Sequence, residues 1–189
     1  MKVLGIACSG RIGGNTEILV REVLKSAAEE GAETELVLVA EKNINPCDGC
    51  FTCQKTGICT IQDDVPALLQ KMVEADAIVL GSPVYYGNVN AQTKAIMDRT
   101  FSIYRDRKLR GKVASPVLAV RRLGAGEARS FMYSFFISHG MIPVRGAIGY
   151  GMNKGDVLQG DGGILGLSAL EEAQNTGKEI VRVVRNFAK

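Results

Sequence analysis

Residues 2–16, KVLGIACSGRIGGNT, join a short apolar run to a turn rich in serine and glycine, and a helix follows at once. The apolar run, Lys2 to Ala7, has the length and composition of a buried strand. The helix continues from Thr16 to about Glu30 with apolar residues on one face, and Gly31 ends it as a C-cap. A strand followed directly by a helix predicts the repeating unit of a parallel sheet.

The same alternation continues along the chain. Further strands are predicted at Glu33–Val39, Ala77–Leu80, Val113–Val120 and Ile142–Ile148. Further helices are predicted from Asp63–Asp64, with Pro66 in the first turn, and at about 90–104, 126–138 and 168–186. Five short strands joined by right-handed crossovers predict an α/β protein, a parallel sheet with helices on both faces. With 189 residues and 46% hydrophobic content, residues 1–189 are expected to form a single domain.

A cluster of cysteines lies in the loop predicted after the second strand, at about 44–61. Cys47, Cys50, Cys53 and Cys59 have the spacing C-x2-C-x2-C-x5-C. Four thiolates brought together by so short a segment are typical of an iron-sulfur cluster, so we predict that these residues are metal ligands. The fifth cysteine, Cys8, lies in an apolar strand and is expected to be a small buried side chain.

Zinc binding and free thiols remain alternative roles for the cysteine loop. Structural zinc also takes four cysteines, but usually as two pairs separated by a longer insert, which this loop lacks. Free or redox-active thiols need no metal at all. A disulfide framework would suit a small secreted chain, whereas no leader-like segment is evident here.

The turn after the first strand has the composition of a phosphate site. Its glycines allow backbone amides to turn inward, Ser9 and Thr16 supply hydroxyl groups, and Arg11 supplies a fork of donors at a helix N-terminus. The turn lacks the GxGxxG and GK[ST] patterns, so a monophosphate is the better prediction. Alternatively, the glycines serve only the geometry of an ordinary turn.

The loop after the third strand, residues 81–90, reads GSPVYYGNVN. Because parallel sheets bind ligands at the carboxyl ends of their strands, this loop should face the same site as the phosphate turn. Its adjacent tyrosines offer a flat surface suited to a planar heterocycle such as isoalloxazine. The loop Arg121–Glu127 is predicted to close the far side of that ring. The glycine-rich stretch 149–167 is predicted to be a surface loop.

Several function classes are not expected. No apolar run reaches the ~18 residues of a membrane span. A formal charge of +3, without a concentrated basic face, does not indicate nucleic-acid binding. Reduced cysteines without a leader favour the cytoplasm. The lone His139 should end a helix, where the dipole favours its charged form, and no catalytic side chain is assigned.

Taken together, these motifs resemble the iron-sulfur flavoproteins, a branch of the NADPH-dependent FMN reductase superfamily, over nearly the whole chain. The matching positions are Ser9, Arg11, Gly14, Asn15 and Thr16; Pro46 to Cys50, Cys53, Gly57, Cys59, Asp63 and Asp64; the stretch SPVYYGNVNA with Lys94, Asp98 and Arg99; and His139 to Met141. The chain departs from the pattern in its shorter, more basic loop Arg121–Glu127 and in Cys8-Ser9, where Gly-Ser is typical.

The resemblance implies a flavodoxin-like doubly wound sandwich with strand order 2-1-3-4-5, FMN at the switch point and a [4Fe-4S] cluster on the cysteine loop. It also implies a homo-oligomer, dimer or tetramer, in which the cluster passes electrons to flavin across a subunit interface, with ferredoxin or a similar carrier as partner. The implied cofactor-binding residues are Ser9, Arg11, Gly14, Asn15 and Thr16 for the phosphate, and Pro83, Val84, Tyr85, Tyr86, Gly87 and Asn88 for the ring.

The resulting hypothesis is an electron-transfer oxidoreductase that moves electrons from a one-electron donor through the cluster to FMN and on to dioxygen, peroxide, a quinone or another carrier. One alternative is an NAD(P)H-dependent FMN or quinone reductase without a functional cluster. The second is a non-catalytic electron carrier or redox sensor.

Overall fold

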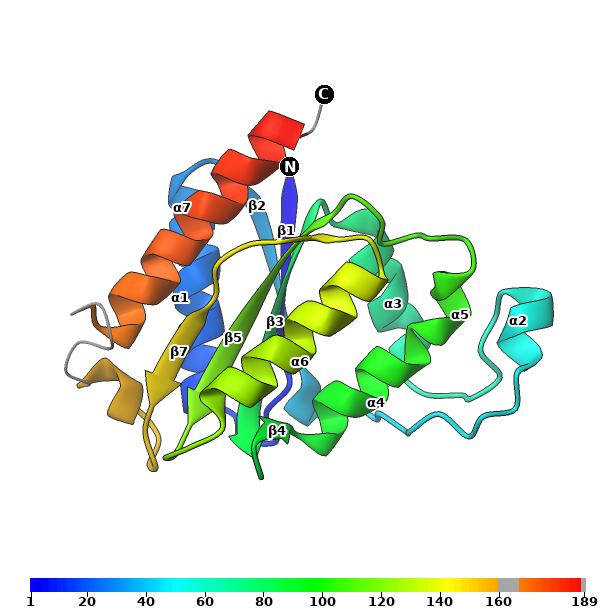
Figure 1. Ribbon diagram of the computed structural model, residues 1–189, viewed down its shortest axis with the longest axis horizontal. Helices are drawn as coiled ribbons and strands as arrows, with labels where there is room; N and C mark the ends of the chain where they lie inside the picture. Colours follow the sequence, from blue (N-terminus) through cyan, green and yellow to red (C-terminus); the bar gives the residue numbers. More distant parts are fainter. Residues whose placement is uncertain (160–166, 188–189) are drawn as a thin grey trace.

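A computed structural model describes residues 1–159 and 167–187 of the chain. A parallel sheet with the strand order β2-β1-β3-β5-β6 forms its centre, and β7 also pairs with β5 (Figure 1). The strands are β1 (Lys2–Ala7), β2 (Glu33–Leu38), β3 (Ala77–Tyr85), β4 (Asn88–Val89), β5 (Val113–Val120), β6 (Ile142–Pro143) and β7 (Ala147–Tyr150). The predicted flavodoxin-like class is confirmed, although the described residues form seven strands rather than five.

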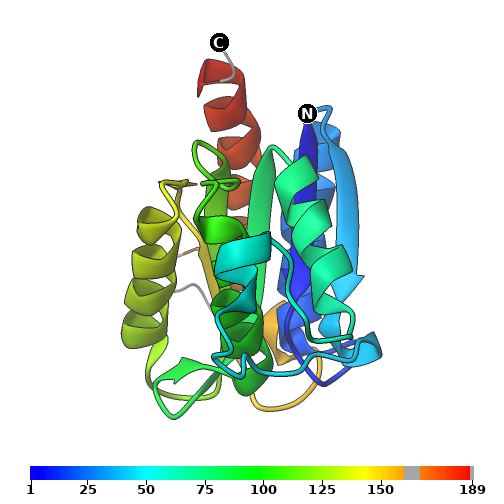
Figure 2. The same cartoon turned by 90° about the vertical axis from the view of Figure 1, so that its right-hand side faces the viewer.

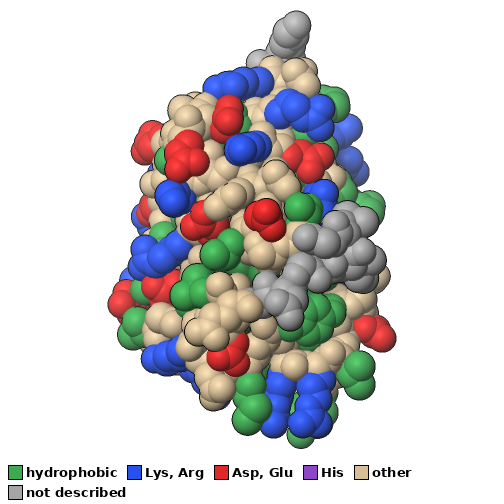
Figure 3. Space-filling model, turned by 90° about the vertical axis from the view of Figure 1, so that its left-hand side faces the viewer, with side chains coloured by type: hydrophobic (Ala, Val, Ile, Leu, Met, Phe, Trp, Pro, Cys, Tyr) green, Lys and Arg blue, Asp and Glu red, His purple; other side chains and the backbone are tan. Residues whose placement is uncertain are grey.

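Helices cover both faces of the sheet (Figures 1 and 2). On one face α1 (Asn15–Glu29) packs against α7 (Ala169–Phe187), and a Cβ added to Gly177 would lie 2.4 Å from the Val23 carbonyl oxygen. The other face carries α3 (Val65–Glu74), α4 (Ala91–Arg99) and α6 (Ala125–Ser138). Charged side chains of both signs are interspersed over the flank that carries α1 and α7 (Figure 3).

The fifth predicted strand, Ile142–Ile148, was wrong in its detail. It is divided into β6 and β7, which both pair with β5. Between them the Ser115 hydroxyl donates to the Arg145 carbonyl oxygen, and a Cβ at Gly146 would lie only 2.0 Å from the Pro116 carbonyl oxygen. Because Pro116 has no backbone N–H, the ladder cannot continue on that side.

Two other boundaries differ from the sequence prediction. The third strand extends through Tyr85 and forms a short hairpin with β4, because Val84 pairs with Val89 and Tyr85 with Asn88. The helix predicted at 90–104 is divided at Thr100 into α4 and α5 (Phe101–Tyr104). Asn90 caps α4, since its side chain accepts a hydrogen bond from the Thr93 N–H at 3.1 Å.

The cysteine loop contains a short helix that the sequence did not predict, α2 (Thr52–Thr56), beside α5 at the flank opposite α7 (Figures 1 and 2). Of the predicted glycine-rich loop, residues 160–166 lie outside the described residues. Its described part contains a 3-10 turn at Asp156–Leu158. Within residues 1–159 and 167–187, no helix has both the length and the apolar character needed to cross a membrane.

Candidate functional site

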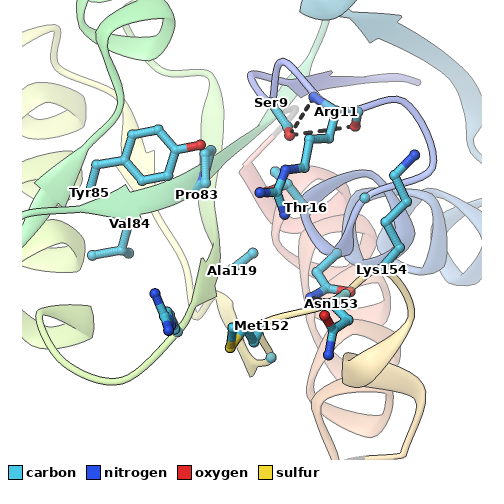
Figure 4. A pocket seen from close by; sticks show the side chains of 14 residues that line it. Ser9, Arg11, Thr16, Pro83, Val84, Tyr85, Ala119, Met152, Asn153 and Lys154 are labelled. Carbon is cyan, nitrogen blue, oxygen red and sulfur yellow. Dashed lines mark hydrogen bonds between the residues drawn. The ribbon is translucent and has the colours of Figure 1, made fainter.

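A hollow of about 620 Å³ lies at the carboxyl ends of β1, β3 and β5 (Figure 4). The predicted residues Ser9, Arg11, Gly14, Asn15, Thr16, Pro83, Val84 and Tyr85 line it together. In Figure 4 the Arg11 and Lys154 side chains lie on the side of the phosphate turn, and Val84 and Tyr85 lie on the other. The structure therefore brings two predicted loops, more than 60 residues apart in sequence, to one cavity.

The turn between β1 and α1 is shaped by its own hydrogen bonds. The Arg11 N–H donates to the Ser9 hydroxyl at 3.1 Å, and a Cβ at Gly14 would lie 3.1 Å from the Arg11 carbonyl oxygen. Ser9 and Thr16 are buried. The first N–H groups of α1 have no partner within the helix, so they remain donors for an anion at this end.

Glu17 is the acidic side chain in the first turn of α1, and its negative charge is compensated by neighbouring donors. Its carboxylate accepts from the Gly13 N–H at 2.7 Å and from Arg21 Nε at 2.8 Å. Burial alone would raise the pKa of Glu17, but these two donors hold it below its ordinary value. Arg11, Arg121 and Lys154 line the cavity, so its electrostatic character favours a phosphate.

The sequence analysis missed one wall of this cavity. Gly151, Met152, Asn153 and Lys154, which follow β7, line it together with Ala119 and Arg121. Asn15 holds the segment in place, because its side chain donates to the Asn153 carbonyl oxygen and accepts from the Gly155 N–H, both at 2.9 Å. Lys154 Nζ donates to the Ile12 carbonyl oxygen at 2.7 Å. The sequence could have indicated this wall by position alone, because the segment follows the fifth predicted strand and therefore starts at the same edge of the sheet.

The predicted ring-binding residues are divided between two hollows. Tyr86 and Gly87 line a neighbouring cavity of about 640 Å³ together with Arg121–Gly124 and Glu127, and this cavity shares Val84, Tyr85 and Arg121 with the first. Gly124 approaches Gly87 closely, because a Cβ there would lie 2.5 Å from the Gly87 Cα. Asn88 lines neither cavity, and its side chain accepts from the Val89 N–H at 2.7 Å.

The four loop cysteines line a third hollow, of about 360 Å³, at the side of α2 and α5. Cys47 and Cys50 are exposed, Cys53 and Cys59 partly buried. Hydrogen bonds from Thr52 lower the pKa of the Cys50 thiol below its ordinary value. Among the described residues no three cysteine, histidine or acidic side chains stand close enough together to form a ready metal site. The thiols therefore share one cavity without being drawn around a common centre.

Within residues 1–159 and 167–187, the cysteine hollow has no lining residue in common with the cavity at the strand ends. It is instead continuous with a groove between α4, α5 and α6, since Asp98 and Phe101 line both.

His139 lies in that groove, at the C-cap of α6 as predicted, but its expected charged form was wrong. Its Nε2 is 2.9 Å from the Thr100 hydroxyl, which itself donates to the Met97 carbonyl oxygen. Nε2 is therefore the protonated nitrogen, and within the described residues the buried Nδ1 has no partner. Burial lowers the pKa of His139 below its ordinary value of 6.5.

This burial predicts a pH dependence of stability. A proton on Nδ1 would have no acceptor, so the unfolded state takes it up first, and stability falls as the pH drops below 6.5. The free energy of unfolding, measured by urea denaturation at about pH 7.5 and 5.5, should decrease in the wild type and decrease less in His139→Gln. Asp63, whose pKa is lowered from 3.8, contributes its pH dependence only in more acidic solution. An equal decrease in both proteins would contradict the assignment to His139.

Comparison with known proteins adds independent information. Residues 1–153 match the family described as NADPH-dependent FMN reductase. An iron-sulfur flavoprotein of Methanocaldococcus jannaschii is 43% identical, with 100% of both chains covered. An iron-sulfur flavoprotein of Archaeoglobus fulgidus is 34% identical over 95% of this chain and 79% of its own length. A third, from Methanosarcina thermophila, is 34% identical over 76% of this chain and 77% of its own.

Solved structures agree on the fold. RosB, with bound 8-demethyl-8-formylriboflavin-5'-phosphate, superposes with a TM-score of 0.75 at 18% identity and covers 100% of this chain and 80% of its own. A flavodoxin, WrbA-like protein from Agrobacterium tumefaciens gives a TM-score of 0.68 at 18% identity, with 98% of each chain covered.

Proposed function

The chain belongs to the NADPH-dependent FMN reductase family and, within it, to the iron-sulfur flavoproteins, and from this premise we propose that it passes electrons from a one-electron donor through a [4Fe-4S] cluster to FMN. It is a flavin-dependent oxidoreductase with FMN as its flavin. The electron path and the cluster are the proposal. The observation that carries it is the gathering of Cys47, Cys50, Cys53 and Cys59 around one cavity in a chain whose relatives are iron-sulfur flavoproteins.

The cavity at the strand ends suits FMN in size and in charge. Ser9, Arg11 and Thr16 would hold the phosphate together with the N–H groups that open α1. The Asn15 side chain is already engaged by the segment after β7, so its part is to keep that segment closed over the phosphate. Pro83, Val84 and Tyr85 would bear on the ring, with Tyr86 and Gly87 at its outer end. When bound, flavin supplies the ability to exchange one or two electrons.

The cysteine cavity suits a small thiolate-held cluster. Its donor set is four sulfurs on one short segment, which is the ligation that iron-sulfur clusters require. The chain can fold back on itself between the ligands because three residues adopt positive φ. They are Gly49 at 71°, Phe51 at 58° and Gly57 at 75°. When bound, such a cluster supplies one-electron transfer. The four thiols would have to move closer together to ligate it.

The separation of the two cavities bears on assembly. Among the described residues the two cavities share no wall, so a cluster and a flavin in one chain would not be in direct contact across a common side chain. We propose a homo-oligomer, a dimer or tetramer, in which the cysteine loop of one copy faces the flavin of another. Ferredoxin or a similar carrier is the proposed donor. Arg105 lies beside the cysteine loop, because its Nη1 donates to the Gln54 carbonyl oxygen on α2, and its basic charge there would attract an acidic carrier.

A second candidate is an NAD(P)H-dependent FMN or quinone reductase whose thiols play no part. The family description, which names NADPH, favours including it.

One experiment separates the two functions. Protein purified without air should be assayed for FMN, iron, sulfide and zinc, and its flavin reduction compared with reduced ferredoxin and with NAD(P)H as donors. We expect about one FMN and roughly four irons and four sulfides per chain, with faster reduction by ferredoxin. FMN without sulfide, combined with turnover on NAD(P)H, would favour the reductase instead.

A further inference from the structure

One buried arginine joins both ends of the cysteine loop. Arg99, the last residue of α4, is 1% exposed. Its Nη1 donates to the Asn45 carbonyl oxygen at 2.9 Å, and its Nη2 donates to the Ile61 carbonyl oxygen at 3.4 Å. Asn45 precedes the first loop cysteine by two residues, and Ile61 follows the last by two. A single guanidinium therefore fixes the separation between the start and the end of the segment that carries the thiols.

Asp63 completes this clamp. Its carboxylate receives a bidentate pair of hydrogen bonds from Arg99, at 2.8 and 3.0 Å, and also accepts from the N–H groups of Asn45 at 2.9 Å and Val65 at 3.0 Å. Both side chains of the ion pair are fully buried. Burial alone would raise the pKa of Asp63, but these donors keep it below its ordinary value. A buried ion pair adds little net stability compared with apolar packing, so its value here is the geometry that it imposes.

The guanidinium also has one donor to spare. Arg99 Nε is buried and has no hydrogen-bond partner within the part of the chain that the structure describes. A buried N–H without an acceptor is costly, and native proteins rarely keep one without a reason. The Cys59 sulfur is the neighbour that matters: burial alone would lower the pKa of Arg99, but Asp63 and Cys59 raise it above its ordinary value. The guanidinium that carries this spare donor therefore interacts with a proposed cluster ligand.

We propose that Arg99 is a positioning residue that also sets the reduction potential of the cluster, because it clamps the loop on Asp63 and donates its Nε–H to the Cys59 sulfur when that sulfur ligates iron. This inference rests on the proposed function. A cluster gains negative charge when it is reduced, so a cationic donor at a ligand sulfur stabilises the reduced form and raises the potential. Arg99 would then make it easier for the electron donor to reduce the cluster. It would leave the flavin cavity unchanged, because Arg99 does not line that cavity.

The test uses Arg99→Lys, which keeps the positive charge but loses both the fork and the Nε–H, and Asp63→Asn, which weakens the clamp but keeps that N–H. The holoprotein of each variant, purified without air, is assayed for iron and sulfide, and the cluster midpoint potential is followed by electron paramagnetic resonance. Arg182→Lys, an exposed arginine on α7, is the matched control. We expect a potential more negative by about 59 mV in Arg99→Lys, a tenfold change for one electron, and none in the control. Asp63→Asn should leave the potential unchanged or raise it, because Arg99 loses its counter-charge.

A lower potential in Arg99→Lys, without a decrease in Asp63→Asn, separates this role from simple anchoring. If Arg99 only fastened the loop, both variants would lose cluster in parallel without a directed shift, and the proposal would be overturned. Limited proteolysis of the metal-free proteins tests the clamp without any cluster: cleavage between residues 45 and 61 should be faster in both variants, and unchanged rates would overturn that part. Wild-type protein without sulfide would overturn the proposed function itself, whereas an intact cluster with equal potentials in wild type and Arg99→Lys would overturn only the role of Arg99.

Discussion

Simultaneous replacement of Cys47, Cys50, Cys53 and Cys59 by serine is expected to reduce iron and sulfide from roughly four each per chain to near zero, with FMN still bound at wild-type occupancy. With four serines the loop offers none of the soft thiolate donors that the iron of an iron-sulfur cluster prefers. FMN should remain because the cavity proposed for it shares no lining residue with the cysteine hollow in the described part of the chain. Colorimetric assays of iron and sulfide, with flavin measured after heat release, give the three contents on one sample.

The fifth cysteine provides the matched control. Cys8 is fully buried, and burial raises the pKa of its thiol to about 12, so it stays protonated and cannot act as a thiolate ligand. Cys8→Ala should therefore keep both cofactors. Iron and sulfide that survive in the four-serine variant, or that disappear in Cys8→Ala, would contradict the assignment of the loop thiols as ligands.

Charge reversal in the phosphate turn, Arg11→Glu, is expected to weaken FMN binding to the apoprotein by roughly 100-fold or more. The substitution removes a charge-assisted hydrogen bond to the phosphate and places a like charge beside it. Flavin fluorescence quenching during titration measures the affinity. Lys178→Glu makes the same change in net charge on an exposed face of α7, away from the cavity, and should leave the affinity as in the wild type.

Titration with riboflavin distinguishes an effect of Arg11 on phosphate binding from an effect on ring binding. Riboflavin lacks the phosphate, so its affinity should be nearly the same in wild type and Arg11→Glu. An equal loss for riboflavin and FMN would show that Arg11 acts on the ring or on the fold, contrary to the phosphate assignment.

The elements with regular apolar patterns could be predicted from the sequence alone. β1, its turn and α1 lie within a residue or so of the predicted bounds. A buried strand is a short apolar run and an amphipathic helix has apolar residues at helical spacing, so both can be recognised in the sequence. Where a tertiary contact determines the backbone conformation, the sequence carries no such periodic pattern. The division of the fifth strand depends on Ser115 and Pro116 in a neighbouring strand, and the end of α4 on contacts around Thr100.

The same distinction applies to the site. The phosphate turn and the tyrosine loop could be predicted because their residues are adjacent in sequence and chemically distinctive. The wall after β7 could not, because Asn15 holds it across 138 residues of sequence. Arg99 was noted only as part of a motif, since its contacts with Asn45 and Ile61 lie 54 and 38 positions away. Pairings of that kind become visible only when the sheet brings α4 beside the cysteine loop.

The most direct test of the electron path is the rate at which the flavin is reduced in a single turnover. Anaerobic wild-type protein and the four-serine variant, both loaded with FMN, are mixed rapidly with reduced ferredoxin, and the bleaching of the flavin absorbance is followed. We predict fast bleaching in the wild type and at least a roughly 100-fold slower rate in the variant, because the variant lacks the one-electron cluster proposed on the cysteine loop. Equal rates in the two proteins would contradict a path through the cysteine loop.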